Sequence, residues 1–342
     1  MLKSRRFWIG VGISILFLFL FLYRTDFAEM GEALGEANYL FLLPGILIYF
    51  VGVFFRSLRW QYLLKPLGTF SSFRLFPLIV IGFLVNNVLP ARLGIVARAY
   101  ILGEKEGKSK MAIGGTMVVE QVFDGVTLLL FAAIISLFVP LEGLTQQAVY
   151  VAAGLFLGAL ALCFTLVYSQ RLSRRAIALL VRILPKRWRG RAEKWLILLI
   201  EGLGIMRSPG KLLTVLTISV LVWLSEAGTF YMIGFAFDLG LPFHVFLLAA
   251  SVANLAWALL MTPGGLGPFD YFVKQILWKG FGVTEAVATS YVVALHAIIL
   301  LPMIALGFVF LWMENLSLAK IMPGERRLAQ DHDPSAEKRG EE

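Results

Sequence analysis

Several long apolar stretches of this sequence contain ionisable side chains, and these residues are the ones whose types could do chemistry. A charge in the middle of a membrane helix costs roughly 2.5 to 3.5 kcal/mol, so it is expected only where it has a function or a partner. The residues of this kind are Arg92, Arg98, Glu120, Asp124, Glu226, Asp270, Lys274 and His296. Their chemistry would be ion pairing or the binding of a charged ligand.

The first two arginines lie around a proline and glycine break, Pro90 to Gly94, and two acids follow in the next apolar run. Glu120 and Asp124 are four residues apart and share one face of a helix. A guanidinium and the N-terminus of the helix after Gly94 both favour an anion such as a phosphate. The predicted anion-binding residues are Arg92, Arg98, Asn86 and Asn87. The alternative is that the acids and bases only neutralise one another and stabilise the fold.

Further polar residues in the apolar runs are assigned to other roles. Arg56 and Arg59 lie near the end of a run and are expected to anchor a helix at the membrane interface rather than to bind a ligand. His296 is expected to be a hydrogen-bonded structural residue, and Glu226 is left open. The predicted charge cluster comprises Glu120, Asp124, Asp270 and Lys274, of which the last two are the next candidates for the anion site.

Motifs of soluble enzymes are absent from the sequence. There is no Walker loop, no His-Glu-x-x-His, no cysteine pair and no Gly-x-Ser-x-Gly. The stretch Gly264-Gly265-Leu266-Gly267 is rich in glycine but lies between apolar runs, so it is interpreted as a helix break and not as a nucleotide site. We therefore expect neither a metal, nor a cofactor, nor catalysis.

The composition is that of a membrane protein. Of the 342 residues 59% are hydrophobic and 15% are charged, whereas soluble domains carry about 25% charged residues. The net charge of +9 lies in short clusters beside apolar runs, which argues for membrane orientation and against nucleic-acid binding. Cys163 is the single cysteine, so no intrachain disulfide can form.

Eight apolar runs are long enough to enter or cross a bilayer. They lie at 7–23, 40–64, 73–90, 112–138, 147–168, 211–238, 243–262 and 287–313. The acidic loop 24–39 is expected outside, and the loop 169–210, which is rich in Lys and Arg, in the cytoplasm. These charges place both ends of the segment 73–110 in the cytoplasm, so it is predicted to turn back as a re-entrant hairpin at Pro90 and Gly94.

A second break of similar spelling follows at an offset of 173 residues, where Pro263 to Gly267 repeats the Pro-x-x-Leu-Gly of Pro90 to Gly94. The predicted fold is therefore an all-α polytopic membrane protein with about six full spans and two re-entrant hairpins in an inverted repeat, a design typical of transporters. Chance similarity of two proline and glycine breaks is the alternative. The predicted helix breaks are Pro90, Gly94, Pro263, Gly264, Gly265 and Gly267.

The chain is expected to form one membrane domain, 1–319, with repeats at about 40–138 and 211–313 and a disordered polar tail, 320–342. Within the basic loop, 171–184 has leucines on one helical face and Arg171, Arg174, Arg175 and Arg182 on the other. Such a helix is expected to lie on anionic lipid of the inner leaflet, with a protein partner as the alternative. The first span is expected to be retained, which places the N-terminus in the cytoplasm. The C-terminus is expected on the same side, and the membrane is expected to be the inner membrane of a prokaryote.

The sequence resembles the transmembrane region of lysylphosphatidylglycerol synthases and its stand-alone relatives, which are regarded as lipid flippases. The matching elements are Arg56-Ser57-Leu58-Arg59-Trp60, Asn87 to Gly94 with Arg98, Glu120 with Asp124, and Pro263 to Gly267 with Asp270. It departs from the family pattern at Ile95, where relatives often have an acid, and at Gln121, where they often have arginine. Only about thirty residues follow the last span, so we do not expect the synthase reaction itself.

The resemblance implies a flippase that moves a phospholipid or another amphiphilic lipid between leaflets, with its headgroup at the predicted anion site. A second hypothesis is a non-catalytic accessory factor in lipid, polyprenoid or hopanoid trafficking that works with a lipid-synthesising enzyme. The third is a membrane-embedded transferase that uses Glu120 and Asp124 as acid and base.

Overall fold

The chain is mainly helical in the part that the computed structural model describes, and no β-strand occurs there. The described residues are 5–23, 25–88, 93–136, 138–139, 143–183, 189–190, 193, 197, 208–260 and 262–316. The first half contains α1 (Arg5–Leu22), α2 (Phe27–Glu36), η1 (Tyr39–Phe41), α3 (Leu42–Leu63), α4 (Ser72–Val88), α5 (Gly94–Glu106) and α6 (Lys110–Ser136). The second contains α7 (Gly143–Tyr168), α8 (Gln170–Ile183), α10 (Pro209–Ala236), α11 (Phe243–Leu260), η3 (Pro263–Gly265), α12 (Pro268–Gln275), the π-helical turn η4 (Ile276–Gly280) and α13 (Glu285–Met313).

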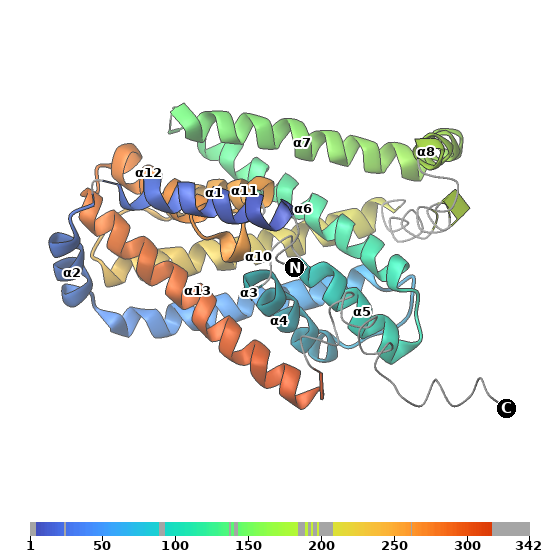
Figure 1. Ribbon diagram of the computed structural model, residues 1–342, viewed down its shortest axis with the longest axis horizontal. Coiled ribbons are helices and arrows are strands. Elements are labelled where there is room, and N and C mark those ends of the chain that lie inside the picture. The colour runs from blue at the N-terminus through green and yellow to red at the C-terminus, as the bar shows by residue number, and fades with distance from the viewer. Residues whose placement is uncertain are drawn as a thin grey trace.

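Long apolar helices form the body of the molecule (Figure 1). Within the described residues five helices are long and apolar enough to cross a membrane, namely α3 with η1, α6, α10, α11 and α13. Large apolar side chains stay exposed on outward faces, for example Leu47 of α3, Leu155 of α7 and Leu301 of α13. Such a surface is stable in lipid and not in water. The fold is therefore the predicted all-α polytopic membrane architecture.

Helices α4 and α5 form an antiparallel hairpin. Their outer ends meet where Arg74 pairs with Glu106 at 3.7 Å and where Gly68 lies beside Lys108. Near the tip, the first residue of α5, Gly94, packs on Gly82 of α4. The segment thus begins and ends at the same end of the molecule, as the loop charges predict. The tip itself, 89–92, with Pro90 and Arg92, lies outside the described residues.

The close approach at the hairpin tip predicts a large effect of one added methyl group. A Cβ at Gly94 would lie 2.1 Å from the carbonyl oxygen of Gly82 and 2.6 Å from Oδ1 of Asn86. Gly94→Ala should therefore lower the free energy of unfolding by about 1 to 3 kcal/mol. Gly114→Ala is the matched control, because a Cβ at Gly114 meets nothing within 4 Å. Thermal unfolding in detergent compares the two variants, and equal transition temperatures would contradict the tight packing.

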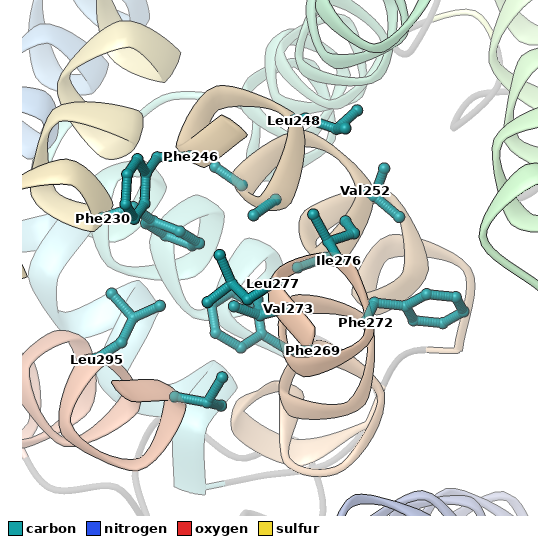
Figure 2. Packing of buried hydrophobic residues seen from close by; sticks show 14 of the residues in the cluster. Phe230, Phe246, Leu248, Val252, Phe269, Phe272, Val273, Ile276, Leu277 and Leu295 are labelled. Atoms are coloured by element: carbon teal, nitrogen blue, oxygen red, sulfur yellow. The ribbon is translucent and has the colours of Figure 1, made fainter. Parts of the chain in front are cut away.

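The second break separates α11 from α12. Here the chain turns through three glycines with positive φ, Gly264 at 60°, Gly265 at 79° and Gly267 at 92°, a backbone that other residues rarely adopt. Leu248 and Val252 of α11 then face Ile276 at the end of the returning segment (Figure 2). The α11–α12 pair therefore forms a second packed hairpin, whose Phe246 and Phe269 lie in one core with Phe230 of α10 and Leu295 of α13.

The elements of the two halves correspond at the offset of the two breaks: α3 with α10, α4 with α11, α5 with α12 and η4, and α6 with α13. The first pair is antiparallel, because Gly45 faces Ile233 at one end and Arg59 reaches Ser219 at the other. The hairpin helices also pack against the opposite repeat. Helix α4 contacts α13 of the second repeat through Leu84 and Gly307, and α11 lies against α6 of the first repeat through Leu255 and Leu128. Equivalent helices that run in opposite directions are the mark of an inverted repeat.

One expected loop is a helix. The acidic segment 24–39 contains α2, which begins after Asp26 because its Oδ1 accepts the backbone N–H of Ala28 at 2.8 Å. The helix packs on the start of α13, where the Ser290 hydroxyl donates to the carbonyl of Met30 at 2.9 Å. Helix α8 does form where the amphipathic pattern predicts it, whereas Leu184 and the tail from 317 lie outside the described residues.

The hairpin makes a testable prediction of sidedness. Thr69 and Ser109 are both exposed, in turns before α4 and after α5 that lie at one end of the molecule. Single cysteines at these positions, in a background without Cys163, should both resist an impermeant thiol reagent in intact cells. Labelling of Ser109→Cys alone from outside would show that the segment spans.

Candidate functional site

The two helix breaks meet in the middle of the fold. A Cβ at Gly264 would lie 3.7 Å from the carbonyl oxygen of Asn87, so the C-terminus of α4 touches the second break. A pocket of about 110 Å³ opens beside this contact, large enough for several waters or a small polar group. Its polar lining residues are Tyr49, Arg56, Asn86, Asn87, Arg98, Glu120, Gln121, Asp124, Trp223, Glu226, Asn254, Trp257 and His296.

A chain of buried ion pairs forms one wall of the pocket. Arg98 Nη2 lies 3.0 Å from Glu120 Oε2, and Glu120 Oε1 lies 3.4 Å from Arg59 Nη2. Arg59 holds both oxygens of Asp124, at 2.6 and 3.0 Å. Alternating charges of this kind compensate one another, which lowers the cost of burying them.

The ion-pair chain continues through Arg56. Its guanidinium lies 3.7 Å from Asp124 and 2.7 Å from Glu226. The amide of Asn254 donates to the other oxygen of Glu226 at 2.9 Å, and the indole of Trp223 donates to Asp124 at 2.9 Å. The network therefore joins α3, α5, α6, α10 and α11 and draws on both repeats.

The three arginines of the network differ in their access to the pocket. Arg59 is fully buried, binds Asp124 and Ser219, and is not part of the lining. Arg56 and Arg98 line the pocket and also lie over aromatic rings, Arg56 over Trp223 at 4.7 Å and Arg98 over Trp60 at 4.2 Å. A ring face holds a guanidinium in place without using its N–H groups. Among the described residues, Arg56 and Arg98 are thus the arginines that a ligand in the pocket can reach.

The expectation that Arg56 and Arg59 anchor α3 at the membrane interface is wrong. Both arginines are buried between α3 and α10, because the antiparallel packing of these helices brings Glu226 and Ser219 to them. An apolar run that contains arginines was itself a signal of buried charge, since such residues need a partner inside a membrane. Their proximity to the end of the run favoured the interface instead.

The second set of predicted charges divides into two. Asp270 binds His296, whose Nδ1 lies 2.5 Å from its Oδ1, and His296 lines the pocket. Lys274 instead lies against α1 and α13, where its Nζ is 2.7 Å from Glu285 and 2.5 Å from the carbonyl of Phe21. Glu120 and Asp124 are therefore brought together as predicted, whereas Lys274 is not near them and takes part in holding α1.

The predicted anion-binding residues that can be placed all line the pocket. Arg98, Asn86 and Asn87 do so, and Arg92 lies outside the described residues. The Oδ1 of Asn86 accepts the backbone N–H of Gly94 at 2.8 Å and so caps the start of α5. Sequence reasoning missed Arg56, Trp223 and Asn254 as members of the site. The partners of Arg56 and Trp223 come from the other repeat, and that of Asn254 comes from a neighbouring helix of the same repeat.

Known proteins of similar sequence support the architecture. A UPF0104 membrane protein of Methanothermobacter thermautotrophicus is 24% identical over 278 residues, which cover 77% of this chain and 82% of that protein. The UPF0104 membrane protein MJ1078 of Methanocaldococcus jannaschii is 29% identical over 198 residues, or 56% of this chain and 78% of that protein. The glycosyltransferase AglD of Haloferax volcanii is 24% identical over 303 residues, which cover 80% of this chain but 49% of that protein.

The family described as the lysylphosphatidylglycerol synthase transmembrane region matches residues 7–307. This match extends from α1 to α13 and includes both hairpins and the whole ion-pair network. The chain therefore belongs to the lysylphosphatidylglycerol synthase transmembrane-region family.

Proposed function

We propose that this protein moves a lipid with a phosphate-bearing headgroup between the leaflets of the membrane, and that the headgroup passes through the central pocket. The observation that carries the proposal is the position of Arg56 and Arg98, which line a pocket at the meeting point of two helix breaks. Acyl chains are soluble in the bilayer, so only the headgroup needs a polar route across it. A pocket with charged walls inside an apolar bundle supplies such an environment.

Arg98 has the capacity to bind a phosphate. Its Nη atoms contact Glu120, while its Nε is buried without a hydrogen-bond partner among the described residues. Glu120 keeps a second cation, Arg59, so it would stay neutralised if Arg98 turned to a ligand. Helix α5 begins at Gly94, which also lines the pocket, and a helix N-terminus adds a partial positive charge. These features together favour an anionic group beside Arg98.

The ion pairs could instead be purely structural, as in an accessory factor for lipid trafficking that works with a separate enzyme. Such an enzyme is a candidate partner, because the family is described as the transmembrane region of a lipid synthase. A membrane-embedded transferase is the third candidate, and the match to part of a glycosyltransferase is the observation that favours it. We rank it last because each carboxylate of the pocket is bound to an arginine, which reduces its capacity to act as a base.

Reconstitution into liposomes separates the three functions. The purified protein should speed the exchange of a fluorescent phospholipid between leaflets over that in protein-free vesicles, as measured by quenching from outside. Formation of a modified lipid would indicate the transferase, and neither result would indicate the accessory factor. Arg74→Gln is a suitable control, because the Arg74 side chain is 78% exposed and pairs with Glu106, which does not line the pocket.

We also propose that α8 lies on anionic lipid of the inner leaflet. Its described Arg171, Arg175 and Arg182 are exposed, and each basic residue near such a surface gains about 1 kcal/mol. Replacing these three arginines by glutamine should weaken binding of a synthetic 170–183 peptide to vesicles with anionic lipid and leave binding to neutral vesicles unchanged. Equal binding of the unsubstituted peptide to anionic and neutral vesicles would contradict the proposal.

A further inference from the structure

His296 of α13 faces a hydrogen-bond acceptor with each of its two ring nitrogens. Nδ1 lies 2.5 Å from Oδ1 of Asp270, and Nε2 lies 3.0 Å from the carbonyl oxygen of Gly264. A neutral imidazole has a single N–H and can donate only one of these bonds. The other oxygen of Asp270 accepts the backbone N–H of Gly267 at 2.8 Å, so the carboxylate accepts on both sides. This geometry fits an imidazolium that carries both ring protons, bound to a carboxylate.

We propose that the Asp270–His296 pair is a proton-binding site that holds the second helix break against the first, and that release of this proton is coupled to movement of a lipid headgroup through the pocket. The coupling to lipid movement rests on the proposed function. The proton site and its hold on the break do not.

The connection to the helix break is direct. Gly264 has a φ of 60° within η3, and its neighbours across the contact are Asn87 of α4 and Leu300 of α13. When the proton passes from Nε2 to a water in the pocket, the neutral ring keeps its Nδ1–H bond to Asp270. The lone pair on Nε2 then faces the carbonyl oxygen of Gly264, which loses its donor. Loss of the proton therefore loosens the break where it touches α4.

The charged groups around His296 have partners of their own. The titratable residues that share the pocket with it are Tyr49, Arg56, Arg98, Glu120, Asp124 and Glu226. The three carboxylates are paired with arginines. On neighbouring turns Lys274 pairs with Glu285, and the acids Glu29, Glu32 and Glu36 of α2 are exposed at the start of α13. The Asp270–His296 pair can thus gain or lose a proton without breaking the arginine network.

The protonation state is measurable without any lipid transport. The chain has three histidines, and ring-labelled protein in nanodiscs would give NMR signals for them, with His296 assigned by loss in His296→Gln. At about pH 7.5 His296 should carry both ring protons. A neutral His296 ring at this pH would overturn the proposal.

The hold on the break is tested by a cysteine in place of Leu300, whose Cδ1 would lie 3.6 Å from a Cβ at Gly264. In a background with Cys163→Ala, labelling of Leu300→Cys is compared with and without His296→Gln at each pH, so that the change in thiolate content cancels. At low pH, His296→Gln should speed the labelling of Leu300→Cys about tenfold, as expected for the loss of one hydrogen bond from a charged group. The ratio of the labelling rates with and without His296→Gln should fall toward one at high pH. A ratio of one at every pH would overturn the hold.

The coupling to lipid movement is tested in liposomes, with His244→Gln as the control. A pH gradient should change the rate of phospholipid exchange in wild type and in His244→Gln but not in His296→Gln. If the rate of phospholipid exchange in wild type is the same with and without the pH gradient, the coupling is overturned and the proposed function is unaffected. Absence of exchange would refute the proposed function and the coupling together, and the NMR and labelling results would then decide the proton site alone.

Discussion

Replacing Asp124 by leucine is expected to destabilise this protein strongly. Asp124 accepts two hydrogen bonds from Arg59 and one from Trp223, and it lies 3.7 Å from Arg56. Its loss leaves the fully buried Arg59 with Glu120 at 3.4 Å as its remaining carboxylate. Removing one partner of a buried ion pair typically costs 3 to 5 kcal/mol, roughly half of the stability of an ordinary domain. Thermal unfolding and the yield of monodisperse protein in detergent measure this loss.

A double substitution provides the control for this prediction. Replacing the buried pair together, with Asp124→Leu and Arg59→Met, removes both charges and leaves an apolar contact. Such replacements are often neutral or stabilising elsewhere, so the double variant should recover part of the stability that Asp124→Leu loses. A double variant no more stable than Asp124→Leu would show that Asp124 acts mainly through Trp223 or Arg56 and not through Arg59.

Replacing Arg98 by glutamine is expected to slow lipid exchange roughly 10- to 100-fold while most of the stability is kept. Arg98 binds one carboxylate, and that carboxylate retains Arg59, so the charge left behind is still paired. A lost hydrogen bond between charged groups costs about 1.5 to 3 kcal/mol, which corresponds to a reduction in headgroup binding of roughly 10- to 100-fold. The exchange rate in liposomes and the unfolding temperature should be measured on the same preparations.

Two variants show whether this effect belongs to the pocket. Arg98→Lys keeps the charge but not the planar fork, so its rate should lie between those of wild type and Arg98→Gln. Arg74→Gln removes an exposed arginine and should leave exchange unchanged. Equal loss of exchange and stability in Arg98→Gln, repaired by adding Glu120→Gln, would instead assign Arg98 a structural role.

Local features predicted much of the fold. Proline and glycine spacing identified both breaks, and the loop charges required the α4–α5 segment to return to its starting side, as the contact of Gly68 with Lys108 confirms. The four-residue spacing of Glu120 and Asp124 placed both acids on one face of α6. These features depend on residues close in the chain, so a single sequence contains the information.

The contacts that complete the site could not be read in the same way. Arg56 and Glu226 are 170 residues apart, and Arg59 and Ser219 are 160 residues apart, because α3 meets its counterpart α10 only through the antiparallel packing of the repeats. Asp270 and His296 come together from α12 and α13, which are joined through η4 and the turn before α13. No local pattern tells which helix will face a buried charge, so the partners remained unassigned.

The central claim, that a lipid headgroup passes through the pocket, is tested most directly by blocking the pocket in protein that is already reconstituted. Ala258 lines the pocket, so Ala258→Cys in a background with Cys163→Ala places a single thiol there. Val309, which is 47% exposed on α13, provides a matched cysteine on the outer surface. Phospholipid exchange is measured in the same liposomes before and after a bulky thiol reagent. Exchange should stop when Ala258→Cys is modified and continue when Val309→Cys is modified, whereas undiminished exchange in fully modified Ala258→Cys would contradict the account.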